Sequence, residues 1–136
     1  MELKLENTES ERTHELANLI RAYNRANREQ SKSEPLNIYL EDEKGNLVAG
    51  MVAETFGNWL EIEYLYVSED LRRQEIGSKI LKMAENESRN RGCKYSFVDT
   101  FNFQAPKFYE KHGYKEVFAL KNYPYTGERY YYTKEL

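Results

Sequence analysis

Apolar and polar residues alternate along several short stretches of this chain. The pattern predicts β-strands, because successive side chains of a strand point to opposite faces. Leu36, Ile38 and Leu40 alternate in the first stretch of the central region. The expected strands there cover residues 36–40, 47–56 and 59–67, with turn residues at 44–46 and 57–58 between them. The central region is therefore expected to form an antiparallel meander.

The N-terminal region combines a short alternating stretch with a longer helical pattern. Residues 2–5 alternate and are expected to form a short first strand. Apolar residues then recur at helical spacing and predict a helix over about residues 9–28. They are Leu16, Leu19, Ile20 and Tyr23. Thr8 and Glu11 fit a capping box at the start of this helix, in which each side chain satisfies a free backbone amide.

After the meander, helical and strand patterns alternate. Ile76, Ile80, Met83 and Ala84 mark one face of a helix that ends before Gly92, a natural left-handed C-terminal cap. Strands are expected at 94–100, 114–120 and 129–134, and a helix at 105–112. This order predicts an α/β fold with a mixed (α+β) sheet. A right-handed crossover would leave the strands at 59–67 and 94–100 roughly parallel.

Length and composition limit the classes of protein that the chain can represent. Its 136 residues are close to the commonest domain size, and 40% hydrophobic with 32% charged residues is a soluble globular balance. The net charge of −3 argues against generic nucleic-acid binding. The longest nearly apolar run, 47–53, is too short to cross a bilayer. The N-terminus shows no export signal, so a cytoplasmic protein without a membrane partner is expected.

Cysteine and histidine are scarce, whereas tyrosine is abundant. The single Cys93 excludes an internal disulfide and a multi-cysteine zinc site, and we expect it to pack as a small apolar group. His14 and His112 lack ligand spacing with other candidates, so no metal site is expected. The chain has 12 tyrosines, and its tyrosine-rich last strands could support a homodimer.

Residues 65–78 form the first candidate site, because a strand ends there, a polar turn follows and a helix begins. The free amides and partial positive charge of a helix N-terminus favour an anion. Arg72 and Arg73 add fixed positive charge, and Gly77 lets the backbone approach a phosphate closely. An ordinary helix start with solvated arginines is the alternative interpretation.

Residues 102–114 form the second candidate site. Pro106 suits the first turn of a helix. Phe108 and Tyr109 are adjacent and cannot share one helical face, so one is expected in the core and the other at the side. A short amphipathic helix with a tyrosine at its rim is the alternative interpretation.

Together the two segments resemble the GNAT (general N-acetyltransferase) superfamily, and the tail resembles small bacterial members of unassigned substrate. The Arg-x-x-x-x-Gly-Ser segment from Arg72 to Ser78 is similar to the family's acetyl-CoA motif. Asn102-x-x-Ala105-x-x-Phe108-Tyr109 is similar to its second motif. The resemblance implies a single domain over residues 1–136, with a mostly antiparallel sheet, splayed central strands and flanking helices. It also implies acetyl transfer from acetyl-CoA to a primary amine of a small molecule or protein, by direct attack in a ternary complex.

The resemblance further implies a role for each matching residue. The backbone amides of Leu65, Tyr66 and Val67 would bind the pantetheine arm as an added strand would, and Val67 would polarise the thioester carbonyl. Residues holding the pyrophosphate would be Arg72, Arg73, Gln74, Glu75, Ile76, Gly77 and Ser78. Asn102 would hydrogen-bond the cosubstrate and Phe108 would pack near the pantetheine. Tyr109 would protonate the leaving CoA thiolate, because a phenol stays protonated at neutral pH.

A general base for the amine has two candidates, Glu61 and Glu63. The period of two places both on one face of the third strand of the meander with Leu65 and Val67. Glu61 lies where some family members carry a catalytic glutamate, and Glu63 lies nearer the thioester. Two carboxylates so close together could raise the pKa of one of them. Alternatively, both are exposed charges that favour cationic amines, and water takes the proton.

The candidate phosphate loop departs from the family pattern, because Arg73 and Glu75 stand where glycine is usual. A Cβ and a carboxylate beside a pyrophosphate oppose binding if the Glu75 side chain points inward. A non-catalytic regulator that binds acyl-CoA is therefore one alternative to an enzyme. An interaction module built on the tyrosine-rich C-terminus is another.

Overall fold

The computed structural model describes all 136 residues and divides them into two compact units, Met1–Ser31 and Lys32–Leu136. The first unit contains helix α1 (Glu11–Asn27). The predicted helix is thus confirmed, but its cap is not the predicted one. Ser10 is the N-cap residue and forms a capping box with Thr13, because the helix begins later than the Thr8–Glu11 pattern suggested.

Residues 2–5 do not form the predicted strand. Leu3 and Leu5 are exposed, and no other strand lies within this unit to satisfy their backbone groups. An alternating pattern becomes a strand only where a neighbouring strand pairs with it. The predicted apolar face of α1 exists, but its residues are 52–68% exposed and none of the helix is buried.

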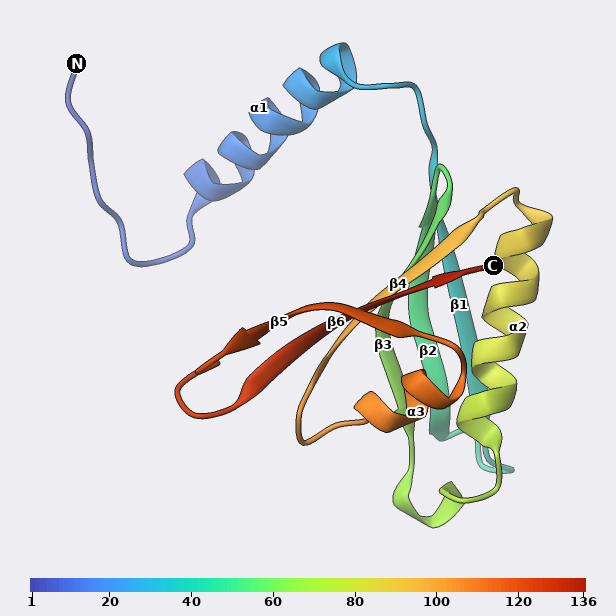
Figure 1. Ribbon diagram of the computed structural model, residues 1–136. Coiled ribbons are helices and arrows are strands. Elements are labelled where there is room, and N and C mark those ends of the chain that lie inside the picture. The colour runs from blue at the N-terminus through green and yellow to red at the C-terminus, as the bar shows by residue number, and fades with distance from the viewer. The chain divides into compact units, whose positions relative to one another are not determined.

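The second unit is built on one mixed sheet of six strands (Figure 1). Its elements in chain order are β1 (Ser33–Glu41), β2 (Leu47–Phe56), β3 (Trp59–Val67), the short 3-10 helix η1 (Glu69–Leu71), α2 (Ile76–Asn90), β4 (Tyr95–Phe101), α3 (Pro106–Lys111), β5 (Lys115–Lys121) and β6 (Glu128–Glu135). The strand order is β1-β2-β3-β4-β6-β5. Only β3 and β4 pair in parallel, as the crossover predicted. None of the helices combines the length and apolar character that a bilayer-spanning segment needs.

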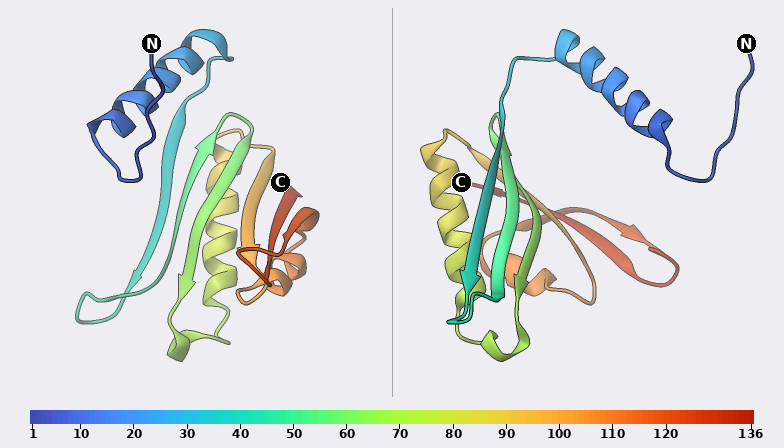
Figure 2. Two further views of the ribbon diagram at one scale, coloured as in Figure 1. Left: turned by 90° about the vertical axis from the view of Figure 1, so that its left-hand side faces the viewer. Right: turned by 180° about the vertical axis from the view of Figure 1, so that it is seen from behind.

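Helix α2 packs against one face of β1, β2 and β3 (Figure 2). Its buried stripe includes Ile80, Leu81 and Ala84, which join the core with Met51 and Leu60. Met83, which the sequence placed on this face, is 59% exposed. It follows Leu81 by two residues and therefore points to nearly the opposite side of the helix.

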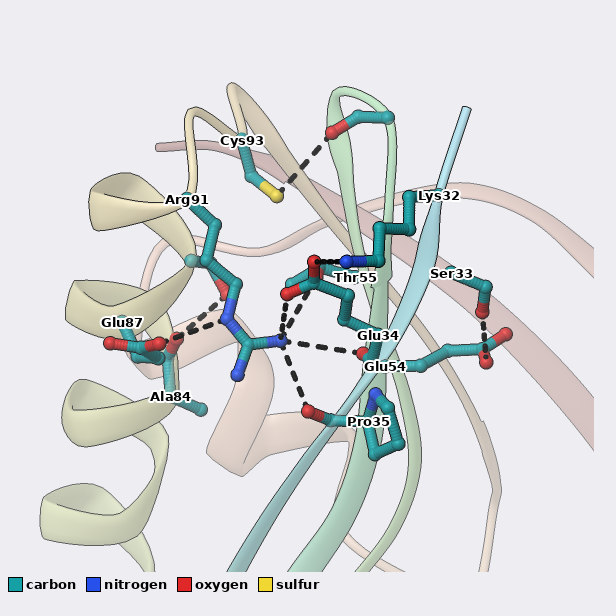
Figure 3. Close-up of polar contacts among 12 residues, drawn as sticks. Lys32, Ser33, Glu34, Pro35, Glu54, Thr55, Ala84, Glu87, Arg91 and Cys93 are labelled. Carbon is teal, nitrogen blue, oxygen red and sulfur yellow. Dashed lines mark hydrogen bonds and ion pairs between the residues drawn. The ribbon is translucent and has the colours of Figure 1, made fainter. Parts of the chain in front are cut away.

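Arg91 fastens the end of α2 to the sheet (Figure 3). Its guanidinium donates to the backbone carbonyls of Glu34 and Pro35 and to the Thr55 hydroxyl at 3.0–3.3 Å. Cys93, close by, is buried and its thiol contacts the carbonyl of Gly57 at 3.6 Å. Burial raises the pKa of the Cys93 thiol, and the predicted packing role is confirmed.

The two central strands separate along their length. β3 and β4 pair only from Trp59 to Ile62 and from Tyr95 to Val98. Beyond Val98, β4 remains paired with β6, whereas the β4-facing edge of β3 is open up to Val67. The splayed central strands expected from the resemblance are therefore confirmed.

Candidate active site

The open edge of β3 exposes backbone groups at Leu65 and Val67. The amide of Ser68 donates to Val48 of β2 at 2.8 Å, and amides alternate in direction along a strand. Leu65 and Val67 therefore direct their amides to the open edge. Tyr66 lies opposite Gly50, with its backbone directed at β2, so only its neighbours can pair with a ligand at this edge.

The turn between β3 and α2 adopts a backbone that favours glycine. Arg73 and Glu75 have φ values of 70° and 63°, so both occupy the left-handed region at the two positions where the family pattern has glycine. The first intrahelical hydrogen bond of α2 runs from Lys79 to Glu75. The amides of residues 76–78 precede it and have no acceptor within the helix, and Glu75 provides no side-chain cap.

The charged side chains of this turn leave the helix start accessible. Glu75 is 71% exposed, and its carboxylate lies 3.9 Å from the Lys111 ammonium on α3. The carboxylate is therefore directed toward a cation. Arg72 donates through Nε to the Val67 carbonyl at 3.2 Å, which holds its guanidinium at the carboxyl end of β3.

Gly77 lies where α2, α3 and the end of β3 meet. A Cβ on Gly77 would lie 3.4 Å from the Phe108 ring and 3.7 Å from Val67 Cγ2. Ser78 is buried, and its hydroxyl forms a 2.8 Å hydrogen bond with His112 Nε2 at the end of α3. The Ser78 hydroxyl, which the sequence placed at a pyrophosphate, thus links α2 to α3.

Tyr109 is only 5% exposed, yet it lines the same cleft as the open strand edge. Its ring packs edge-on against Phe108 and Tyr114. No protein group hydrogen-bonds its hydroxyl, which leaves the proton free for a ligand. Burial, and secondly the charge of Asp99, raise the pKa of Tyr109 to about 12.

A shift of register in the β2–β3 pair changes which face carries the candidate bases. Val52 pairs with Tyr64, but the next residue of β2, Ala53, pairs with Ile62, so Glu63 is an extra residue without a partner. The prediction that Glu61 shares one face of β3 with Leu65 and Val67 was therefore wrong. Leu65 and Val67 pack against the core, whereas Glu61 lies on the opposite face with Tyr64.

Glu61 faces a second carboxylate that the sequence reasoning missed. Its partner across the pair is Glu54 of β2. Burial first, and then hydrogen bonding with Glu54 and its charge, raise the pKa of Glu61. Glu61 and Glu54 both line the cleft, and so does Glu63. Only the β2–β3 register brings Glu54 into this group, because it lies outside both sequence motifs.

Asn102 is used differently from the expectation. Its side-chain oxygen accepts from the Glu128 amide at 3.2 Å, and Asn102 does not line the cleft. Gln104 lines the cleft instead, and its side-chain oxygen accepts from the Phe101 amide at 2.8 Å. The carboxamide of Asn102 thus orders the start of β6.

An arginine from β6 also enters the cleft, without a signal in either motif. Arg129 pairs with Asp99 at 2.7 Å and donates to the Tyr123 hydroxyl at 3.2 Å. Its guanidinium lies 5.3–5.8 Å from the centres of three aromatic rings, of Phe101, Tyr123 and Tyr131. Arg129 and Asp99 neutralise one another at this wall.

The open edge of β3, the turn before α2, Tyr109, the three glutamates and Arg129 line a single cleft of about 1370 Å³. Near the start of α2 its charged residues are mainly basic: Arg72, Arg73 and Lys111, with Glu75. Around the point where β3 and β4 separate they are mainly acidic: Glu54, Glu61, Glu63 and Asp99, with Arg129. The cleft therefore offers an anion site at one end and a site for a cation at the other.

Comparison with known proteins identifies the family. A profile of the Acetyltransferase (GNAT) family matches residues 2–114. An acetyltransferase of Agrobacterium fabrum is 37% identical over 99 residues, which are 73% of this chain and 72% of that protein. The crystal structure of an acetyltransferase from Bacillus cereus has a TM-score of 0.87 at 27% identity and covers 98% of both chains. This chain belongs to the GNAT acetyltransferase family.

Another relative is named after its acceptor. The blasticidin-S acetyltransferase of Streptomyces morookaense is 33% identical over 109 residues, which are 77% of this chain and 80% of that protein. In this GNAT protein, Arg73 and Glu75 adopt the backbone that glycine would take.

Proposed function

We propose that this GNAT protein transfers an acetyl group from acetyl-CoA to a primary amine, of a small molecule or a protein, by direct attack in a ternary complex. Residues 1–136 would act as one N-acetyltransferase domain. The observation that carries the proposal is the cleft itself. An open strand edge, a free helix start and a buried tyrosine with an unpaired hydroxyl line it together.

The residues at the basic end of the cleft suit the phosphates of acetyl-CoA. The free amides at residues 76–78 point toward the N-terminal side of α2, where the helix dipole is positive. Arg72 and Arg73 supply charge. The amides of Leu65 and Val67 lie on the edge along which a pantetheine arm would pair, and Phe108 forms the wall beside Gly77.

Acetyl transfer then requires three groups from the protein: a donor to the thioester carbonyl, an acid for the sulfur and a base for the amine. The amide of Val67 polarises the thioester carbonyl while the amine nitrogen attacks its carbon. The carbon–sulfur bond breaks, and Tyr109 donates its phenolic proton to sulfur and is reprotonated by solvent. Because the pKa of Tyr109 is raised to about 12, the phenol stays protonated, and so able to donate, up to about pH 11. The amine proton passes to a base, for which Glu61 is the best-placed carboxylate.

The acidic end of the cleft suits an acceptor that carries positive charge. Aromatic side chains accompany the carboxylates there, including Tyr64, Phe97 and Phe101. Aromatic faces and carboxylates both attract ammonium groups. We therefore place the acceptor amine in this half of the cleft, opposite the proposed donor phosphates.

Replacing Tyr109 tests the proposed function directly. Tyr109→Phe should lower kcat by about 10²–10⁴-fold, because general acid catalysis is lost. It should leave acetyl-CoA binding intact, measured as the rise in Tm with acetyl-CoA. Tyr39→Phe is the matched control, because Tyr39 is exposed on β1 and lies outside the cleft.

The two alternative functions predict different results. A regulator would bind acetyl-CoA but consume none with any member of a broad amine panel. An interaction module would show no rise in Tm with acetyl-CoA, even well above micromolar concentrations. Turnover that is unchanged in Tyr109→Phe would refute the role of Tyr109 as the acid.

A further inference from the structure

Glu54 and Glu61 form a carboxylate pair across β2 and β3. Their Cα atoms are direct partners in the strand register, and both line the cleft. Like charges that face each other on neighbouring strands destabilise a sheet. This unfavourable pair lies where β3 and β4 begin to separate, because the pairing of β3 with β4 ends at Ile62.

Ser33 orients the Glu54 carboxylate without neutralising it (Figure 3). The hydroxyl of Ser33 donates to Glu54 Oε2 at 2.8 Å. The neighbouring Lys32 pairs instead with Glu34 at 3.2 Å, on the face of the sheet that Arg91 contacts. Within residues 32–136, no basic side chain forms an ion pair with Glu54 or Glu61. Ser33 therefore fixes the Glu54 carboxylate and leaves its charge in place.

The surroundings make the Glu61 carboxylate a stronger base than an ordinary glutamate. Burial and Glu54 both raise the pKa of Glu61. Other titratable groups on this part of the cleft are Glu63 and Tyr64 on β3, and Asp99 on β4, which Arg129 neutralises. A general base works best when its pKa approaches the working pH, and Glu54 shifts Glu61 in that direction.

We propose that Glu54, oriented by Ser33, is a positioning residue for Glu61, and that Glu61 takes the proton that the acceptor amine loses. This inference rests on the proposed function. In the step, the nitrogen–carbon bond forms and the carbon–sulfur bond breaks. One N–H bond is exchanged for an O–H bond on Glu61, while the sulfur receives the proton of Tyr109. Ser33 and Glu54 touch neither reactant and act through Glu61.

The test compares pH profiles of kcat/KM for Glu54→Gln, Ser33→Ala and the wild type. Two primary amines with different pKa values serve as acceptors. A limb of the pH profile that reports titration of the amine will differ between the two acceptors, whereas the limb that reports titration of Glu61 will lie at the same pH with both. Glu54→Gln should lower kcat about tenfold and move the Glu61 limb to lower pH by roughly one unit, because the like charge is gone. Ser33→Ala should lower kcat by a smaller factor than Glu54→Gln, because it removes the hydrogen bond that orients Glu54 but leaves the Glu54 charge in place. Glu41→Gln is the control, because Glu41 is an exposed carboxylate at the far end of β1, outside the cleft.

A second measurement separates this inference from the proposed function. The carboxyl carbon of Glu61, identified by the signal that Glu61→Gln removes, is titrated by NMR in the free wild type and Glu54→Gln. Its titration should shift to lower pH in Glu54→Gln. If amines are acetylated but neither the kinetic limb nor this titration moves, Glu54 is only structural and the inference is overturned. If the titration moves but no amine is acetylated, the proposed function is what fails, and with it the catalytic role of the pair.

Discussion

Gly77→Ala should affect folding and donor binding in opposite directions. The added Cβ would lie 3.4 Å from the Phe108 ring and 3.7 Å from Val67 Cγ2, which are ordinary contacts without a clash. Alanine is a better helix former than glycine by about 0.5–1 kcal/mol, and Gly77 belongs to the first turn of α2, where the lower value applies. Burying part of a methyl group adds a few tenths of a kcal/mol. The free energy of unfolding should therefore rise by roughly 0.5–1 kcal/mol.

The same methyl group narrows the slot between Val67 and Phe108, both of which line the cleft. In the proposed mode of binding, the donor would run from the edge of β3 past this slot to the start of α2. We expect acetyl-CoA to bind about tenfold more weakly, which corresponds to ~1.4 kcal/mol. The expected result is a more stable protein whose Tm rises less with acetyl-CoA.

Urea unfolding without ligand measures the first effect, and calorimetric titration with acetyl-CoA measures the second. Asn86→Ala is the matched control: Asn86 is exposed on α2, and its replacement gains helix propensity without touching the cleft. An unchanged Kd in Gly77→Ala would refute the proposed donor path. Equal weakening in Asn86→Ala would show that the effect does not come from the slot.

Two further substitutions test the turn and the core. Glu75→Gly should stabilise the chain by up to about 1 kcal/mol and tighten acetyl-CoA binding, because it relieves a left-handed backbone and removes a carboxylate. Asn122→Gly, at a φ of 57° outside the cleft, should give a smaller stability gain in urea unfolding, because asparagine tolerates the left-handed region, and should leave acetyl-CoA binding unchanged. Lys134→Met should lower the free energy of unfolding by roughly 3 kcal/mol, since it leaves Glu85, 4% exposed, with the Tyr114 hydroxyl as its remaining partner. Adding Glu85→Gln should recover much of that loss, and failure to recover it would contradict the unpaired-charge explanation.

The sequence was sufficient for features that depend on residues close together along the chain. Helical spacing predicted α1 and α2, alternation predicted the meander, and the strand–helix–strand order predicted the parallel pair of β3 and β4. The turn before α2 was also recognisable from its arginines and from Gly77. The helices and strands follow from local periodicity. The parallel pairing follows from the right-handed crossover that connects two strands through a helix.

Tertiary structure decided the features that depend on which strand lies opposite which. The register shift at Val52 and Ala53 moved Glu61 to the face opposite Leu65, and it set Glu54 against Glu61. Asn102 bonds the β6 backbone, a partner far away in sequence. A period of two holds only while the ladder is regular, and one unpaired residue reverses the face of every residue beyond it. The sequence therefore indicated the basic end of the cleft and two of its carboxylates, Glu61 and Glu63, whereas only strand pairing revealed that Glu54 lies beside them.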